Sequence, residues 1–156
     1  MIWLGSFDGA SQAVAANTIV ESTQSGAMGA SDGEPGDTLI RTRGSLLVFA
    51  TGTADADVMF GVGLIELNFP IPVGTNLPGP LTEGDDDWIW HQVVPLRVDT
   101  SEQAAVKSAN RIEIDSKAMR KLEGNSALVW VLQTVNDVGT AGVRTFLGAR
   151  YLLKKG

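Results

Sequence analysis

The sequence predicts an all-β domain, a β-sandwich or barrel with one short helix. Several segments rich in β-branched and aromatic residues alternate with connections rich in Gly, Pro and Asp, and only one segment carries the signals of a helix. The 156 residues are enough for one ordinary domain and too few for two comfortable ones. We expect residues 38–156 to form the sandwich. Residues 1–37 are expected to form a flexible N-terminal arm or a set of loops, in which only residues 18–20 look strand-like.

Six segments have the composition of strands. They are, in chain order, residues 39–49, 58–67, 88–94, 111–114, 126–135 and 143–153. Gly44 leaves open whether the first segment is one strand or two, and Gly61 and Gly63 indicate a bulge or the close approach of another backbone in the second. Pro95 limits the third strand to a sheet edge or marks its end.

The later strands differ in their expected surroundings. Residues 111–114 alternate charged and apolar side chains, as a half-buried strand does. Residues 127–132 are apolar without interruption, which predicts a strand covered on both faces. Residues 136–142 are expected to connect the last two strands as a hairpin loop.

The predicted helix covers residues 115–124. Asp115 is placed to cap its N-terminus, basic residues lie toward its C-terminal end, and Gly124 can supply the left-handed residue that ends it. Three apolar side chains would face the core: Ala118, Met119 and Leu122. Residues 99–110 fit a short helix or a loop equally well.

Composition excludes several kinds of chemistry. The chain has no cysteine and one histidine, so thiolate nucleophiles, disulfides, zinc–thiolate sites and multi-histidine metal sites within one chain are excluded. Its apolar runs are shorter than the ~18 to 20 residues of a membrane-spanning helix, and we expect no membrane partner. The chain lacks a Gly-x-Ser-x-Gly elbow, a Walker loop and a dinucleotide fingerprint, and His91 is better interpreted as a partly buried strand residue than as a catalytic one. We therefore expect no enzymatic activity and no catalytic residue.

Charge is distributed unevenly along the chain. Residues 1–96 contain two basic and twelve acidic side chains, whereas residues 97–156 contain ten basic and six acidic ones, so the two parts carry −10 and +4. Solvated loops can produce such a distribution by chance. The alternative is that acidic and basic surfaces meet between identical subunits, or that the basic part faces a polyanion inside an assembly.

The stretch from Asp85 to His91 is the most distinctive in the chain. Asp85, Asp86 and Asp87 follow a Pro- and Gly-rich loop and lead into a strand. Calcium takes ~6 to 8 oxygen ligands, which these carboxylates, Glu83 and loop carbonyls could partly supply. The three aspartates are therefore candidate metal ligands, with calcium as the candidate ion. The alternatives are a solvated acidic turn and, more weakly, paired carboxylates for glycoside hydrolysis.

Tryptophans follow these aspartates directly. Trp88 and Trp90 are two residues apart, so on a regular strand they point to one face while Ile89 points to the other. Their rings could stack on the apolar faces of a sugar, but core packing is the commoner role of such a pair. We expect Trp88, Trp90 and Trp130 to be core residues, with a sugar-binding platform as the alternative.

Basic residues of the predicted helix are candidate contacts for nucleic acid or for another subunit. They are Lys117, Arg120 and Lys121. Lys117 and Lys121 are four residues apart and would share a helix face. Few aromatic residues interleave with these charges and the net charge is −6, so only nonspecific binding inside an assembly is expected. The alternative is a solvated helix surface.

A resemblance rests on several motifs in order. They are Arg41-Thr42-Arg43-Gly44 with Leu46-Leu47-Val48, Gly61-Val62-Gly63-Leu64, a Pro-rich loop, Asp87-Trp88-Ile89-Trp90-His91, the segment from Ile114 to Leu122, and Arg150-Tyr151-Leu152-Leu153. Over roughly residues 38–153 the chain resembles small virion structural proteins, capsid or coat proteins predicted from environmental viral sequences. The resemblance implies a jelly-roll-like β-sandwich that self-assembles with identical subunits in a virion. Residues 1–40 lack the arginine-rich arm of many small coat proteins, which puts genome packaging through such an arm in doubt.

Two functions are therefore carried forward. The first is a homo-oligomeric virion structural protein that forms a shell or coat, which the long loops, the small-residue N-terminal segment and the lack of a catalytic constellation favour. The alternative is a β-sandwich binding module, for carbohydrate or a surface receptor, on a phage or bacterial surface. A hydrolase that uses the acidic loop ranks third.

Overall fold

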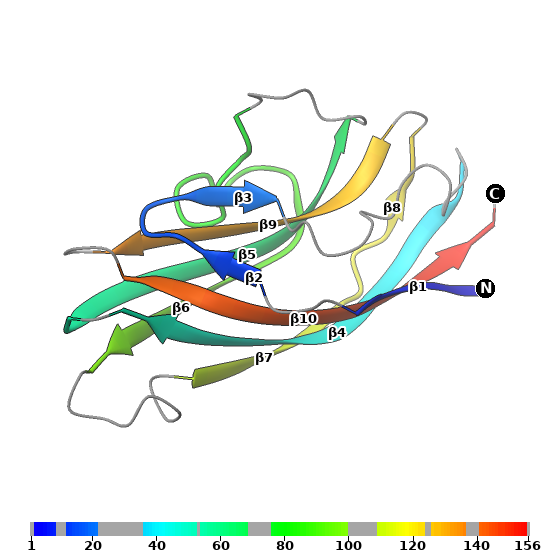
Figure 1. Cartoon of the computed structure of the whole chain (residues 1–156). Helices are drawn as coiled ribbons and strands as arrows, with labels where there is room; N and C mark the ends of the chain where they lie inside the picture. Colours follow the sequence, from blue (N-terminus) through cyan, green and yellow to red (C-terminus); the bar gives the residue numbers. More distant parts are fainter. Residues whose placement is uncertain are drawn as a thin grey trace.

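The chain folds into an antiparallel β-sandwich, as the sequence predicts (Figure 1). The computed structural model describes residues 2–8, 12–21, 36–52, 54–68, 76–99, 109–123, 126–136 and 141–155. These ranges contain strands, turns and extended connections but no α-helix. Accordingly, none of the described segments is a helix of the length and apolar character needed to cross a membrane.

Two sheets make up the sandwich. Sheet A has the strand order β1 (Ile2–Asp8), β10 (Gly142–Lys154), β4 (Thr38–Thr51) and β7 (Ala109–Ser116), with β2 (Gln12–Val14) paired to β10 and β8 (Arg120–Lys121) paired to β4. Sheet B has the order β3 (Ile19–Glu21), β9 (Ser126–Asn136), β5 (Ala56–Asn68) and β6 (Trp88–Val98). All pairings are antiparallel. Figure 1 shows the sheets stacked on one another, with both termini at the same end.

The long strands lie where the side-chain pattern predicts them. β4 is a single strand that continues through Gly44, because the backbone of β10 lies so close that a Cβ at this position would collide with the Gly148 carbonyl oxygen. β6 is an edge strand of sheet B, in agreement with the position of Pro95. In the N-terminal segment β3 matches the strand-like residues 18–20, whereas β1 and β2 were not predicted and pair with β10.

The predicted hairpin between the last two strands is wrong. β9 belongs to sheet B and β10 to sheet A, so the chain crosses from one layer to the other. Residues 137–140 of the connection lie outside the described residues. Both strands are apolar enough to pack in either sheet, and their composition does not distinguish a hairpin from a crossover.

The predicted helix at residues 115–124 is also wrong. Asp115 does not cap a helix, because its carboxylate accepts two hydrogen bonds from Arg41, at 2.8 Å from Nε and 2.7 Å from Nη2. The Leu122 N–H donates to the Asp37 carbonyl at 2.8 Å, which continues the pairing of β8 with the start of β4. Tertiary pairing thus outweighs local helix propensity. Ala118 is exposed and Met119 is 70% exposed, so only Leu122 of the expected core side chains is buried.

The main core lies between the sheets and is centred on Trp130, which is 2% exposed. The Trp130 indole N–H donates to the Tyr151 hydroxyl at 2.6 Å and so links β9 of sheet B to β10 of sheet A. Burial raises the pKa of Tyr151, which keeps its hydroxyl neutral. Trp90 meets Trp130 edge-on with ring centroids 6.0 Å apart. The structure confirms Trp130 as a core residue.

Candidate functional site

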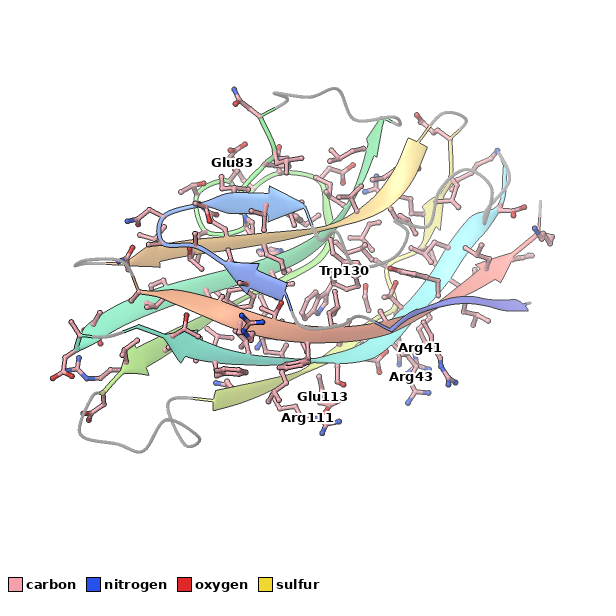
Figure 2. All side chains as sticks on the ribbon, viewed as in Figure 1. Arg41, Arg43, Glu83, Arg111, Glu113 and Trp130 are labelled. Atoms are coloured by element: carbon pink, nitrogen blue, oxygen red, sulfur yellow. The ribbon has the colours of Figure 1, made fainter. Side chains whose placement is uncertain are left out.

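Most arginine side chains of sheet A point outward, away from the core. Side chains alternate between core and solvent along β4 and β10, and the outward-facing residues of the two strands come into register. The outward pairs are Arg41 with Leu152, Arg43 with Arg150, Ser45 with Gly148, Leu47 with Phe146, and Phe49 with Arg144. Arg41, Arg43 and Arg111 lie together on this side of the sandwich in Figure 2.

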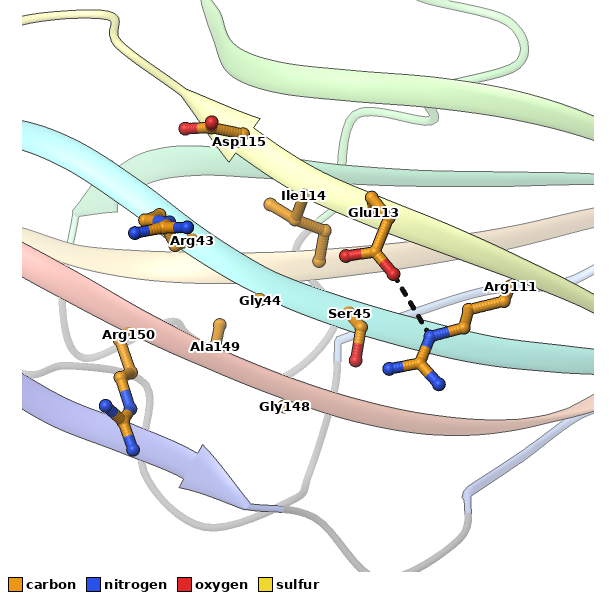
Figure 3. A pocket seen from close by; sticks show the side chains of 10 residues that line it. All are labelled: Arg43, Gly44, Ser45, Arg111, Glu113, Ile114, Asp115, Gly148, Ala149 and Arg150. Atoms are coloured by element: carbon orange, nitrogen blue, oxygen red, sulfur yellow. Dashed lines mark hydrogen bonds and ion pairs between the residues drawn. The ribbon is translucent and has the colours of Figure 1, made fainter.

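A depression lies in this face, and we call it the arginine saddle. Its rim carries Arg43 of β4, Arg111 of β7 and Arg150 of β10, and its floor is formed by Ser45 and Gly148 (Figure 3). The depression has a volume of about 580 Å³. Small floor residues between long basic side chains leave room for a ligand group several atoms across.

Two carboxylates, Glu113 and Asp115, also line the saddle, and both already have partners. Glu113 accepts a hydrogen bond from Arg111 Nε at 3.1 Å, drawn as the dashed line in Figure 3. Asp115 is bound by Arg41, whose guanidinium lowers the pKa of Asp115. Neither Arg43 nor Arg150 makes an ion pair with any side chain that the structure describes.

An apolar group lies next to the saddle on the same face. Leu47 and Phe146 are each 41% exposed, and the Phe146 ring stacks on Phe49 with centroids 6.1 Å apart. We call Leu47, Phe49 and Phe146 the phenylalanine patch. Exposed aromatic side chains that neighbour arginines have the composition of a protein interface.

On the outer face of sheet B, in contrast, residues 76–88 cover the part around Val129 and Val131, whereas Met59, Val93 and Val135 on the same face are 39%, 40% and 41% exposed. Leu77 and Trp88 pack on a second cluster of buried side chains, formed by Ile65, Val129 and Val131. Gly61 leaves space for Pro80 and Leu81, since a Cβ at Gly61 would lie 2.9 Å from Leu81 Cγ. The structure therefore confirms that β9 is covered on both faces, as its uninterrupted apolar sequence predicts.

A bulge separates the two tryptophans. Leu64 pairs with Trp90 and Ile65 with Trp88, so two steps along β6 oppose one step along β5. As a result Trp90 packs against the main core and Trp88 against the cluster on the outer face. The expectation that both rings share a face is wrong, because the extra residue, Ile89, reverses the alternation.

Gln133 holds the covering loop to the sheet. This side chain is buried on β9, and its Oε1 accepts a hydrogen bond from the Leu81 N–H at 2.9 Å, while its Nε2 donates to Thr82 Oγ1 at 3.4 Å. The Glu83 N–H donates to the Gly79 carbonyl at 2.7 Å, which closes the turn, and the Trp88 indole donates to the Glu83 carbonyl at 2.9 Å.

The three candidate metal ligands have different surroundings. All three side chains are exposed, and Asp87 alone of the three forms an ion pair with Arg120, at 2.6 Å, among the described residues. This hydrogen bond lowers the pKa of Asp87. Within the described part of the chain no group of three or more His, Asp or Glu side chains is close enough to hold a metal ion. Calcium binding at this loop stays a prediction.

The three candidate contact residues do not share a helix face. Lys117 lies in the extended segment after β7 and Lys121 on β8, both exposed. Arg120 binds Asp87 and also approaches Glu66 at 3.5 Å, so its charge is used within the chain. Their predicted role in binding nucleic acid or another subunit is not tested by this arrangement.

Part of the uneven charge is neutralised inside the molecule. Four ion pairs join an acidic residue among the first 96 to a basic residue among the last 60. They are Asp57 with Arg97, Glu66 with Arg120, Asp87 with Arg120, and Asp37 with Lys155. Among the other charges, Glu83, Asp85 and Asp86 lie beside sheet B, and the arginines of the saddle lie on sheet A.

His91 is exposed on β6, which corrects the expectation that it is partly buried. Its ring centroid lies 6.0 Å from that of Trp88. Position 91 faces outward on an edge strand, and the covering loop does not enclose it.

Sequence reasoning missed the arginine saddle. Arg43, Arg111 and Arg150 are far apart in the chain and meet only through the registers of β4 with β7 and with β10. The available signal is that each arginine occupies an outward position of an alternating strand. Comparison with protein-family models and with curated proteins finds no significant match to this chain.

Proposed function

We propose that the protein is a structural subunit that self-assembles with identical copies into a shell or coat. The observation that carries this proposal is the opposite charge of the two outer faces. Exposed acidic side chains, Glu83, Asp85 and Asp86, lie on the loop over sheet B, whereas the arginine saddle lies on sheet A. Figure 2 shows Glu83 on one side of the sandwich and Arg43 and Arg111 on the other.

The positions of these charges determine the kind of assembly. A contact between the loop of one copy and the outer face of sheet A of the next is heterologous, because different surfaces meet. Such contacts leave a free acidic face and a free basic face at the two ends, so they continue into rings, shells or filaments. The phenylalanine patch beside the saddle would supply apolar area to this contact.

A virion is the setting that the order of sequence motifs suggests. Small coat proteins need a rigid β core and extended surfaces for neighbours, and this chain has a two-layer sandwich in which the outer face of sheet A is bare. Nonspecific contact with nucleic acid inside the shell is compatible with the basic face.

Sedimentation velocity and negative-stain microscopy test the assembly. Parent protein should form large regular particles at ~0.05 M salt and dissociate at ~0.5 M salt, because added salt screens exposed charges. Phe146→Asp should melt like the parent but sediment as a monomer. Met119→Asp is the matched control, since Met119 is exposed away from the phenylalanine patch, and this variant should assemble normally.

Two results would contradict assembly. One is a monomer at every salt and protein concentration. The other is equal assembly by the parent and by Phe146→Asp. Either result would favour the alternative, a binding module on a phage or bacterial surface.

One observation favours that alternative, although at a different place from the one the sequence indicates. Trp90 is engaged with Trp130, and Trp88 is half-buried against the second cluster, so the pair does not form one platform for a sugar. An open depression formed by the described residues is the arginine saddle, which would select an acidic ligand.

A further inference from the structure

Arg43 and Arg150 face each other directly across two neighbouring strands. They are a register pair of β4 and β10, and both side chains are exposed on the outer face. Like charges directly opposite each other in an antiparallel pair are destabilising. A local conflict of this kind in an otherwise consistent strand pair is typical of a binding site.

The neighbouring carboxylates do not remove this conflict. Asp115 lies beside Arg43 in the register of β4 with β7, but its two oxygens accept hydrogen bonds from Arg41. Glu113 is paired with Arg111. Arg43 and Arg150 therefore make no ion pair with the side chains that the structure describes around the saddle, although the charge of Arg43 also lowers the pKa of Asp115.

The floor between the arginines is small and polar. Ser45 and Gly148 are the next outward register pair after Arg43 and Arg150, and Arg111 approaches from the other side. Guanidinium groups from three strands and the Ser45 hydroxyl thus surround one depression of about 580 Å³. All of these groups can donate hydrogen bonds to an anion.

We propose that the arginine saddle binds a phosphate group. Each guanidinium presents a planar fork of donors that matches two oxygens of an oxyanion. A planar carboxylate has two oxygens, whereas a phosphate has oxygens directed tetrahedrally and can accept from Arg43, Arg150 and Ser45 at once. This site does not depend on self-assembly, since all of its residues belong to one chain.

The repulsion between Arg43 and Arg150 gives the proposal a distinctive signature. Without phosphate, Arg150→Gln should melt at the same temperature as the parent or higher, because the substitution removes a like-charge pair. With phosphate, the parent should gain stability and overtake the variant. If Arg150 only stabilised the fold, Arg150→Gln would melt at a lower temperature than the parent in phosphate-free buffer.

Thermal melting with inorganic phosphate measures this effect. Chloride is adjusted to hold the ionic strength constant, so that general screening is the same in every sample. A ligand tenfold above its Kd should raise the parent Tm by roughly 3–6 °C for a domain of this size. Arg43→Gln and Arg150→Gln should lose the rise, and Arg150→Lys should lose most of it, because lysine keeps the charge but not the fork.

Lys121→Gln is the matched control. It removes the same single charge from an exposed strand position outside the saddle, so its Tm should rise with phosphate as the parent's does. Equal rises for the parent and Arg150→Gln, or no rise for the parent, would overturn the proposal. Repeating the titration on Phe146→Asp separates it from assembly, because that variant is expected to be monomeric and to keep the saddle.

A second titration identifies the source of the phosphate. A short single-stranded DNA oligonucleotide replaces inorganic phosphate, and binding is followed by fluorescence anisotropy. Binding that Arg150→Gln weakens at least tenfold, with Lys121→Gln unchanged, would assign the saddle to a nucleic-acid backbone. A phosphate-dependent Tm rise without oligonucleotide binding would assign it to a small phosphorylated ligand.

Discussion

The two sheets bury their inner faces in one core but differ in how their outer faces meet solvent. On sheet B, Val129 and Val131 point outward and are nevertheless 1% and 0% exposed, because residues 76–88 cover them. On sheet A, Leu47 and Phe146 also point outward and are each 41% exposed. Apolar side chains point outward in both places, and the long connection between β5 and β6 covers only those of sheet B.

The covered residues contribute to the free energy of unfolding, whereas the bare residues are accessible to a partner. Covering Val129 and Val131 removes apolar area from water and adds to the free energy of unfolding, but it makes these two side chains inaccessible to a partner. A bare face adds little to stability and stays accessible. We therefore expect substitutions at the covered residues of sheet B, such as Val129 and Val131, to unfold the protein and substitutions on the outer face of sheet A to change what it binds.

The largest expected effect comes from placing one aspartate on each outer face and comparing the two losses of unfolding free energy. Val131→Asp buries an unpaired carboxylate and should lower the free energy of unfolding by more than ~4 kcal/mol. Leu47→Asp adds a charge at an exposed position and should change it by less than ~1 kcal/mol. Urea unfolding measures both values. Similar losses for the two variants would show that the faces do not differ.

Tryptophan truncation compares the core with the covered face. Trp130→Ala should cost about 3–5 kcal/mol, because its ring is buried between the sheets and its N–H is bonded to Tyr151. Trp88→Ala should cost about 2 kcal/mol, since Trp88 is only half-buried. Thermal melting, beside a glycan-binding screen, gives the measurement. A Trp88 variant with normal melting and lost sugar binding would contradict its packing role.

Gln133 tests the attachment of the loop. Gln133→Ala should cost about 1–3 kcal/mol, because the partly buried Leu81 N–H loses its acceptor. Hydrogen exchange at Leu81 should accelerate, while amides of β4 keep the parent's rate. Ser45→Ala, on the bare face, is the control and should leave stability unchanged to within ~0.5 kcal/mol. Unchanged exchange at Leu81 would mean that other contacts hold the loop.

The smallest effect concerns pH and the ion pair of Asp87 with Arg120. Arg120 lowers the pKa of Asp87 from its ordinary value of 3.8, so the pair stabilises the fold at neutral pH and this contribution is lost as pH falls below about 4 through the lowered pKa. Asp87→Asn should cost less than ~1 kcal/mol at pH 7 and nothing at about pH 2. Asp85→Asn, without such a partner, should match the parent at both. A cost for Asp87→Asn that persists in acid would contradict the role of the charge.

Local pattern was enough to predict the six longer strands from β4 to β10 and the class of fold, but not the strands β1, β2 and β8. Alternation predicted β7, and uninterrupted apolar sequence predicted the covered strand β9. The predictions failed where contacts with residues distant in the sequence determine the local structure. The helix failed because Arg41 and Asp37 bind residues 115–122, and the tryptophans separated because a bulge at Ile89 reversed the alternation.

The arginine saddle could not be predicted for the same reason. Its residues meet only when β4 is paired with both β7 and β10, and the sequence does not state which strands are neighbours. Arg120 shows the converse, because a basic residue that looked available for a partner is engaged by Glu66 and Asp87. The sequence therefore indicates which basic residues are candidates for binding a partner. The pairing of strands determines which of them form ion pairs within the chain.

Hydroxyl-radical footprinting tests most directly whether the bare face of sheet A is the surface that partners cover. The parent is oxidised at ~0.05 M and ~0.5 M salt, conditions in which exposed charges attract strongly and weakly. Our account predicts that Phe146 is oxidised several-fold more slowly at low salt, where the protein is assembled, whereas Met119, which is 70% exposed, reacts equally in both. Equal oxidation of Phe146 in both conditions, while sedimentation shows large particles at low salt, would contradict the account, because the subunits would then meet through another surface.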